Sequence, residues 1–245
     1  FHAIYWPAFL MAAGLEPPKR VFAHGWWTNE GQKISKSLGN VIDPLELIEK
    51  YGLDQMRYFM LRDVSFGSDC DFSHAAMIAR INSNLANDLG NLAQRSLSMI
   101  AKNCGASVPN AGAFTDADKE LLDKAYGACD KVRAELDVQA FHKALDVLWE
   151  LVGDSNRYVD EQAPWALKKT DPARMATVLY VLAETLRVLA ILIQPFMPQS
   201  MGKLLDQLAV APEKRDFTEL TKEGALIEGV PLPQPSGIFP RFVEE

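Results

Sequence analysis

Two lysines three residues apart, Lys33 and Lys36, lie in a short stretch that also carries Ser35 and Ser37. An ammonium group is a compact positive charge on a flexible stem, and the hydroxyl and backbone N–H groups beside it add hydrogen-bond donors. Such a set of donors is suited to the oxygens of a polyphosphate, wherever negative charge builds up on them. A lysine and serine loop of this length is most often a solvated turn, so the flanking sequence has to decide between the two interpretations.

The elements around this loop are expected to anchor it on one side. Residues 21–27 are rich in aromatic and β-branched side chains and predict a strand, and 29–31 predict a turn that leads into the loop. Ahead of the strand, residues 3–13 are apolar and end at a glycine, which predicts a buried helix. After the loop, an Asp-Pro start signal predicts a short helix over 44–51, and a second follows over 54–62.

From residue 73 onward the pattern changes to long helices, because apolar side chains recur every three or four residues. Four such stretches cover residues 77–99, 122–136, 141–152 and 175–193. They predict an antiparallel helical bundle. Beyond 211, proline and glycine predict an extended tail over the body. The expected units are therefore 1–72, 73–210 and 211–245.

Composition limits the classes of protein that the chain can belong to. With 245 residues and 48% hydrophobic content, it can bury a substantial core in one or two domains. The apolar run 178–196 contains charged residues and stops at a proline, so we expect an amphipathic helix and no membrane span. The start shows no signal-peptide pattern, and three widely spaced cysteines predict neither a disulfide framework nor a metal site. These features favour the cytoplasm.

A net charge of −7 argues against a protein that coats nucleic acid, so any such contact should be narrow and partly directed at bases. At 100° per residue, Asn84, Asn87, Asn91 and Arg95 share one face of the predicted helix. Amide and guanidinium groups are suited to reading unstacked bases, and Trp165, in a break between helices, is a candidate stacking surface. For Asn84 we prefer a structural role.

Five segments together carry a resemblance to a known family. They are Lys33-Ile34-Ser35-Lys36-Ser37, the flanking stretches Phe1 to Leu10 and Val21 to Trp26, Asn91-Leu92-Ala93-Gln94-Arg95, Glu161-Gln162-Ala163-Pro164-Trp165, and Ile238-Phe239-Pro240-Arg241. The first resembles the Lys-Met-Ser-Lys-Ser signature of class I aminoacyl-tRNA synthetases, with isoleucine at the methionine position. The others resemble methionyl-tRNA synthetases, from one end of the chain to the other. The fold that this implies is the α/β remnant of a Rossmann-type catalytic domain, followed by a mainly α-helical anticodon-binding bundle.

The resemblance also implies roles for particular residues. The catalytic pair would be Lys36, which steadies the β- and γ-phosphates, and Lys33. The ATP-binding set would be His24, Gly25, Trp26, Lys33, Ser35, Lys36 and Ser37. The methionine pocket would include Phe1, His2 and Trp6. The set that recognises the anticodon would be Asn87, Asn91, Arg95, Pro164 and Trp165. No residues stand at metal-ligand spacing, so no metal site is expected in this chain.

The implied reaction is ATP-dependent activation of methionine to methionyl-adenylate, followed by transfer to initiator and elongator methionine tRNA with a CAU anticodon. ATP, Mg²⁺, methionine and tRNA are the implied cofactors and partners, and a monomer is expected. The chain starts inside a helix-like segment without the His-x-Gly-His element of this class, so we expect a downstream portion that is inactive in adenylation by itself. Two alternatives stay open, namely a non-catalytic tRNA anticodon-binding module and a class I synthetase for another apolar amino acid.

Overall fold

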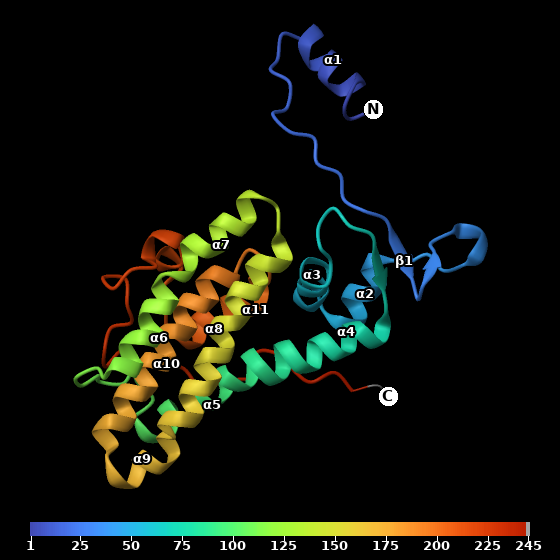
Figure 1. The fold of residues 1–245 in the computed structure, drawn as a ribbon. Helices are drawn as coiled ribbons and strands as arrows, with labels where there is room; N and C mark the ends of the chain where they lie inside the picture. Colours follow the sequence, from blue (N-terminus) through green and yellow to red (C-terminus); the bar gives the residue numbers. More distant parts are fainter. Residues whose placement is uncertain (244–245) are drawn as a thin grey trace.

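A small three-stranded sheet lies beside a large helical bundle in the computed structural model, which describes residues 1–243 (Figure 1). The sheet has the order β2-β1-β3, in which β1 (Trp27–Asn29) pairs antiparallel with β2 (Gln32–Lys33) and parallel with β3 (Cys70–Phe72). The helices are α1 (Tyr5–Ala12), α2 (Pro44–Tyr51), α3 (Leu53–Arg62), α4 (His74–Arg80), α5 (Asn91–Asn103), α6 (Asp116–Tyr126), α7 (Ala128–Asp137), α8 (Phe141–Gln162), α9 (Pro164–Thr170), α10 (Pro172–Ile193) and α11 (Pro198–Gln207). A π-helical segment, η2 (Ile81–Gly90), joins α4 to α5, and three 3₁₀ turns are η1 (Lys36–Leu38), η3 (Pro212–Lys214) and η4 (Phe217–Glu219). The predicted fold class is confirmed.

A tight hairpin leads into the lysine loop, as predicted. Its two turn residues, Glu30 and Gly31, both have positive φ angles, of 49° and 74°. This backbone matches the right-handed twist of the two strands that it connects. Asp71 of β3 accepts hydrogen bonds from the Thr28 hydroxyl (2.6 Å) and the Gly31 amide (2.8 Å). These bonds lower the pKa of the Asp71 carboxyl and fix the hairpin to β3.

The strand predicted over 21–27 is wrong for most of its length. Pairing begins only at Trp27, because the partner strand β3 is three residues long and its register starts with Cys70 opposite Trp27. Residues 20–26 are extended without belonging to a strand. The Phe22 ring stacks on the Phe66 ring, with the two ring centroids 5.2 Å apart. Aromatic contacts of this kind account for part of the apolar pattern that suggested a strand.

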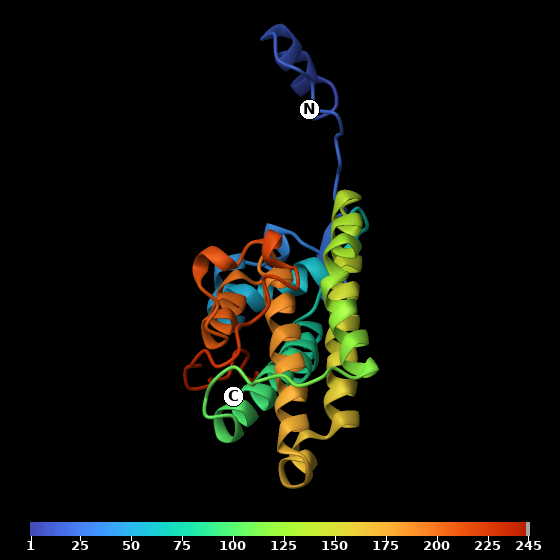
Figure 2. The same ribbon diagram turned by 90° about the vertical axis from the view of Figure 1, so that its left-hand side faces the viewer.

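The helix near the start forms, but the prediction that it is buried is wrong. No residue of α1 is buried, and Trp6 and Phe9 are 53% and 66% exposed. Figures 1 and 2 show α1 standing away from the body at the end of an extended segment. Within residues 1–243 no other element packs on α1, so its apolar side chains have no core to enter.

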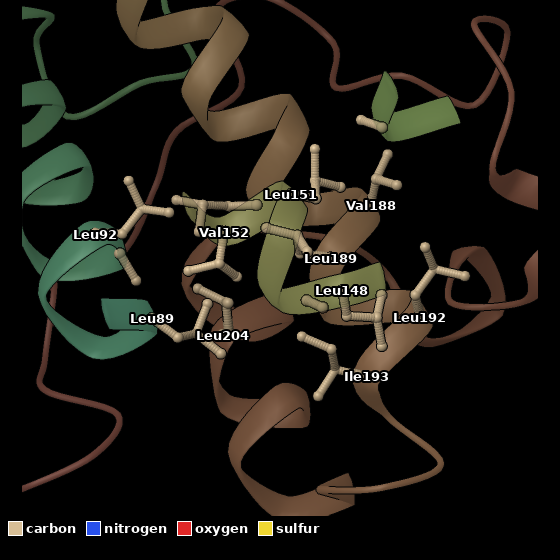
Figure 3. Packing of buried hydrophobic residues seen from close by; sticks show 14 of the residues in the cluster. Leu89, Leu92, Leu148, Leu151, Val152, Val188, Leu189, Leu192, Ile193 and Leu204 are labelled. Atoms are coloured by element: carbon tan, nitrogen blue, oxygen red, sulfur yellow. The ribbon is translucent and has the colours of Figure 1, made fainter. Parts of the chain in front are cut away.

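Helix α10 is the centre of the bundle. Every residue from Thr177 to Ile193 is buried, and α5, α6, α8, α9 and α11 pack around it. Figure 3 shows Leu148 and Val152 of α8 facing Leu189 of α10 within this core. The prediction that this helix is amphipathic is therefore wrong, because α10 has no solvent-exposed face that would carry polar side chains. It is long and apolar enough to cross a membrane, yet 94% of its most apolar window is buried inside the protein, which core packing explains.

The charges that interrupt the apolar pattern of α10 bind the C-terminal tail. Glu184 and Arg187 are 0% and 1% exposed and form an ion pair at 2.6 Å. Arg187 also donates to the backbone carbonyl of Glu219 (2.9 Å), and Glu184 accepts from the Leu226 amide (2.9 Å) and the Tyr126 hydroxyl (3.0 Å). Burial, followed by the charge of Glu184, raises the pKa of Tyr126. A buried pair whose remaining polar atoms are bonded in this way is costly to break.

Helix α3 is shared between the sheet and the bundle. Its Phe59 packs edge-on against Phe72 of β3 in a small cluster with α2 and α4, whereas the neighbouring Tyr58 belongs to the bundle core. The tail closes over the same junction, because the Asn82 side chain both donates to the Phe242 carbonyl (2.9 Å) and accepts from its amide (2.8 Å). The sheet that carries the lysine loop and the helical bundle thus both pack on α3.

Candidate nucleotide and nucleic-acid sites

The lysine loop is organised by its own short side chains. Ser35 accepts a hydrogen bond from the Ser37 amide (3.3 Å) and so caps η1, which ends at Gly39 with a left-handed φ of 67°. Asn40 closes the loop, since its amide group accepts from the Ser35 amide (2.8 Å) and donates to the Lys33 carbonyl (3.1 Å). Asn40 is not among the predicted site residues, although asparagine side chains commonly form hydrogen bonds with nearby backbone groups.

Both lysines of this loop are available to a ligand. Lys33 and Lys36 are exposed, and neither forms an ion pair with any of residues 1–243. The loop is tied to the sheet at one end, because the Asn29 side chain donates to the Asn40 carbonyl (3.0 Å). Two free ammonium groups and a fixed set of Ser and backbone donors therefore lie on one exposed loop, an arrangement suited to phosphate oxygens.

The neighbouring predicted residues lie just ahead of β1. His24 is exposed and its Nδ1 lies 2.8 Å from the carbonyl oxygen of Gly25, while Trp26 is 83% exposed. Gly25 is constrained by the chain itself: a Cβ at this position would lie 2.1 Å from the backbone oxygen of Ser68. The close approach at this glycine is thus made by protein backbone.

Substitution of Gly25 by alanine should loosen the attachment of this segment to β3. The Cys70 amide donates to the Trp26 carbonyl (2.8 Å), and a Cβ on Gly25 would push the two backbones apart. We expect the local opening free energy to fall by about 2 kcal/mol, which is roughly a 30-fold loss of amide-exchange protection at Cys70. Gly202→Ala on α11, where a Cβ meets nothing within 4 Å, is the matched control and should leave this protection unchanged. Equal amide-exchange protection at Cys70 in the wild type and in Gly25→Ala would contradict the view that the close contact between Gly25 and Ser68 holds this segment on β3.

The residues assigned to a methionine pocket lie apart from the lysine loop in this structure. Phe1 and His2 precede α1, Trp6 lies on it, and all three are exposed. Figure 1 places α1 far from the β1–β2 hairpin that carries the lysine loop. The centroids of the Phe1 and Tyr5 rings lie 5.6 Å apart, so these two side chains pack against each other within this segment.

The residues assigned to anticodon recognition, by contrast, do come together. Asn87, Asn91 and Arg95 line one pocket of about 400 Å³ between η2, α5 and α8. Asn87 and Asn91 are exposed at its mouth. The opposite wall contains three residues that the sequence analysis missed, Trp149, Asn156 and Asp160 of α8. Asn156 and Asp160 are four residues apart and therefore share one face of α8. This spacing is the feature of the sequence that could have indicated them.

Arg95 is held in place by this opposite wall. Its guanidinium donates to Asn156 Oδ1 (3.0 Å) and to Asp160 Oδ1 (3.3 Å), and Asn156 in turn donates to the Asp88 carbonyl (3.3 Å). A planar guanidinium fixed through two of its nitrogens presents its remaining donors in a defined direction. The arrangement is suited to reading the edge of a base, because its donors are oriented before the ligand arrives.

Pro164 and Trp165 form a second pocket, of about 220 Å³, that also includes Arg95. Ala163 before them adopts a left-handed φ of 42°, which ends α8 and starts α9 abruptly. Trp165 is left 51% exposed, so its indole face is available for stacking. Arg95 is shared by the two pockets, and all five predicted residues therefore line one continuous face of the bundle.

Asn84 does not belong to this face. Its side chain accepts from Arg80 (3.3 Å) and donates to Asp88 (3.2 Å) within its own helical run, in agreement with the structural role that we preferred. The rotation of 100° per residue assumed for this face also fails over part of it, since η2 is π-helical and turns less per residue.

Comparison with known proteins agrees with these two features. Residues 1–97 match the family model "tRNA synthetases class I (M)", and residues 108–245 match "Anticodon binding domain of methionyl tRNA ligase". The chain is 59% identical over 244 residues to a methionine–tRNA ligase of Brucella suis and 53% identical over 246 residues to that of Mycobacterium bovis. These alignments cover 100% and 99% of the chain but 47% of each relative, so the chain spans about half the length of these relatives.

Solved structures give the same result. The Mycobacterium tuberculosis methionyl-tRNA synthetase in its free state has a TM-score of 0.92 at 49% identity, covering 100% of this chain and 48% of that one. The same synthetase in complex with methionyl-adenylate has a TM-score of 0.93 at 53% identity, covering 98% and 48%. These matches place the chain among the class I aminoacyl-tRNA synthetases. Within that class, the chain belongs to the methionyl-tRNA ligase family.

Proposed function

We propose that the chain serves a methionine–tRNA ligase, which activates methionine with ATP and transfers it to initiator and elongator methionine tRNA. The observation that carries this proposal is the convergence of Asn87, Asn91, Arg95, Pro164 and Trp165 on one face, at the positions that the family resemblance assigns to the anticodon. The domain limits that we propose are 1–72 for the catalytic part, 73–210 for the anticodon bundle and 211–245 for the tail. A cytoplasmic monomer fits this role.

In the catalytic part, we assign the phosphates of ATP to the lysine loop. Lys36 would donate to the β- and γ-phosphates, and Lys33, Ser35 and Ser37 would shape the loop around them. No group of three potential metal ligands occurs within residues 1–243, so we assign Mg²⁺ to the phosphates of ATP itself. His24, Gly25 and Trp26 would lie beside the adenosine, and Phe1, His2 and Trp6 beside methionine.

Discrimination of the CAU anticodon should depend on Trp165. The test is binding of an anticodon hairpin of methionine tRNA at fixed moderate salt, against the same hairpin with the anticodon scrambled. We expect a preference for CAU that Trp165→Ala lowers about 10-fold or more, because stacking of a base on an aromatic ring contributes about 1–3 kcal/mol. Trp26→Ala, which removes a more exposed indole outside the bundle (83% against 51% for Trp165), is the control and should not change hairpin binding.

Equal and weak binding of both hairpins would overturn the anticodon assignment. The lysine loop would then still distinguish a synthetase from a pure RNA-binding module, since only the synthetase depends on Lys36.

A further inference from the structure

Asn40 lies outside the five-residue motif of lysines and serines, yet its side chain holds the two ends of the loop together. Its Oδ1 accepts a hydrogen bond from the Ser35 amide (2.8 Å), and its Nδ2 donates to the Lys33 carbonyl (3.1 Å), seven positions earlier in the chain. Lys33 takes part in this closure through its backbone, which leaves its ammonium group exposed. One asparagine side chain therefore closes the loop.

Asn40 is itself anchored to the sheet. Asn29, the last residue of β1, donates through its Nδ2 to the backbone carbonyl of Asn40 (3.0 Å), and both asparagines are half-buried. Gly39 has a left-handed φ of 67°, a conformation that glycine adopts without strain, and it turns the chain at the end of η1 just ahead of Asn40. The two asparagines thus connect the loop to β1.

The same closure fixes the backbone on both sides of Lys36. On one side, Ser35 is bound to Asn40 through its amide and starts η1 by accepting from the Ser37 amide (3.3 Å). On the other side, the Gly39 amide donates to the Lys36 carbonyl (3.2 Å). Figure 1 shows the loop projecting from the sheet on the side away from the bundle. The direction of Lys36 therefore depends on the bonds within the loop and not on packing against the bundle.

We propose that Asn40, held by Asn29, is a positioning residue for Lys36 in the activation of the amino acid. Both ends of the Asn40 side chain are bonded to the loop backbone, so it acts through Lys36 and not on the phosphates. A charge contributes most to the rate when its position is fixed before the reaction, because no ordering is then needed in the transition state. The inference rests on the function proposed above, since Lys36 matters only if the chain serves an ATP-dependent activation.

The test is methionine-dependent ATP–pyrophosphate exchange by a polypeptide of the relatives' length that contains this sequence. Asn40→Ala removes both side-chain bonds, and we expect kcat to fall about 10- to 30-fold while KM for methionine changes less than about 2-fold. Asn29→Ala removes the anchor but leaves the closure in place, so kcat should fall only about 3- to 5-fold. Asn110→Ala, at an exposed asparagine outside the loop, is the control and should leave kcat unchanged.

Two further measurements separate positioning from a general loss of structure. Added to Lys36→Ala, the Asn40→Ala substitution should lower kcat no more than about 2-fold further, because the charge that it positions has been removed. Amide-exchange protection at Cys70, whose N–H bonds to Trp26 ahead of β1, should be the same in Asn40→Ala and wild type. An equal fold loss with and without Lys36, or lost protection at Cys70, would make Asn40 a structural residue and overturn the inference.

The outcome for Lys36 distinguishes failure of this inference from failure of the proposed function. If Lys36→Ala lowers the exchange rate strongly and Asn40→Ala leaves kcat unchanged, the positioning role is wrong and the proposed function stands. If Lys36→Ala itself leaves the exchange rate unchanged, the proposed function fails, and the positioning role of Asn40 fails with it.

Discussion

Substitution of Lys36 by alanine should lower the rate of methionine-dependent ATP–pyrophosphate exchange about 10²- to 10³-fold, in a polypeptide of the relatives' length that contains this sequence. Lys36 is exposed, free of ion pairs within residues 1–243, and held on a loop that Ser35 and Asn40 fix in place. A charge oriented in this way stabilises the transition state more than the ground state, because the negative charge on the phosphates is redistributed as the bond breaks. The loss should therefore appear mainly in kcat, with little change in KM for methionine.

Two further variants separate this role from general charge effects. Lys33→Ala should reduce the exchange rate less than Lys36→Ala does, since we assign Lys33 to shaping the loop. Lys19→Ala removes an exposed lysine outside the loop and serves as the control for net charge. The catalytic assignment would be wrong if Lys36→Ala behaved like Lys19→Ala. In that case the non-catalytic tRNA-binding module would become the better interpretation of the chain.

Local sequence signals were sufficient wherever the neighbours along the chain determine the structure. The turn at Glu30 and Gly31 and the Asp43 cap, which accepts from the Leu45 amide at 2.8 Å, both form as predicted, because each depends on a few adjacent residues. The gathering of Arg95 and Trp165 around one pocket was also predictable, since both belong to short motifs that point to the same chemistry.

Features that depend on distant contacts were not predictable in this way. Residues 21–25 have strand-like side chains, but a strand also needs a partner, and β3 is too short to supply one. Helix α10 contains Glu184 and Arg187, which suggest a solvent face in the sequence, but both side chains are buried and bind the tail. Asn156 and Asp160 were missed because their partner Arg95 lies more than 60 residues away in the sequence.

Removal of the Asp118 carboxylate should strongly destabilise the bundle. Asp118 is fully buried near the start of α6 and accepts from both terminal nitrogens of Arg174, from the Tyr158 hydroxyl and from the Thr115 amide. Asp118→Ala leaves the Arg174 charge half-buried without its partner, and we expect a loss of about 3–5 kcal/mol in the free energy of unfolding in urea. Asp123→Ala on the same helix removes an exposed pair with Lys222 (3.4 Å) and should cost less than about 1 kcal/mol.

The pH dependence of this stability has a definite sign. Burial by itself would raise the pKa of Asp118, but the hydrogen bonds from Arg174, Tyr158 and Thr115 outweigh it and hold the pKa below its usual value. The folded state therefore binds the proton more weakly than the unfolded chain, whose aspartates titrate near about pH 3.9. The contribution of Asp118 should be complete above that pH and decline as the pH falls towards the lowered pKa of the folded state. Asp118→Asn cannot titrate, so the difference in unfolding free energy between wild type and this variant should shrink between about pH 5 and pH 3. A constant difference across this range would show that Asp118 is not held ionised by this network, and the bundle would then derive its acid sensitivity from other carboxylates.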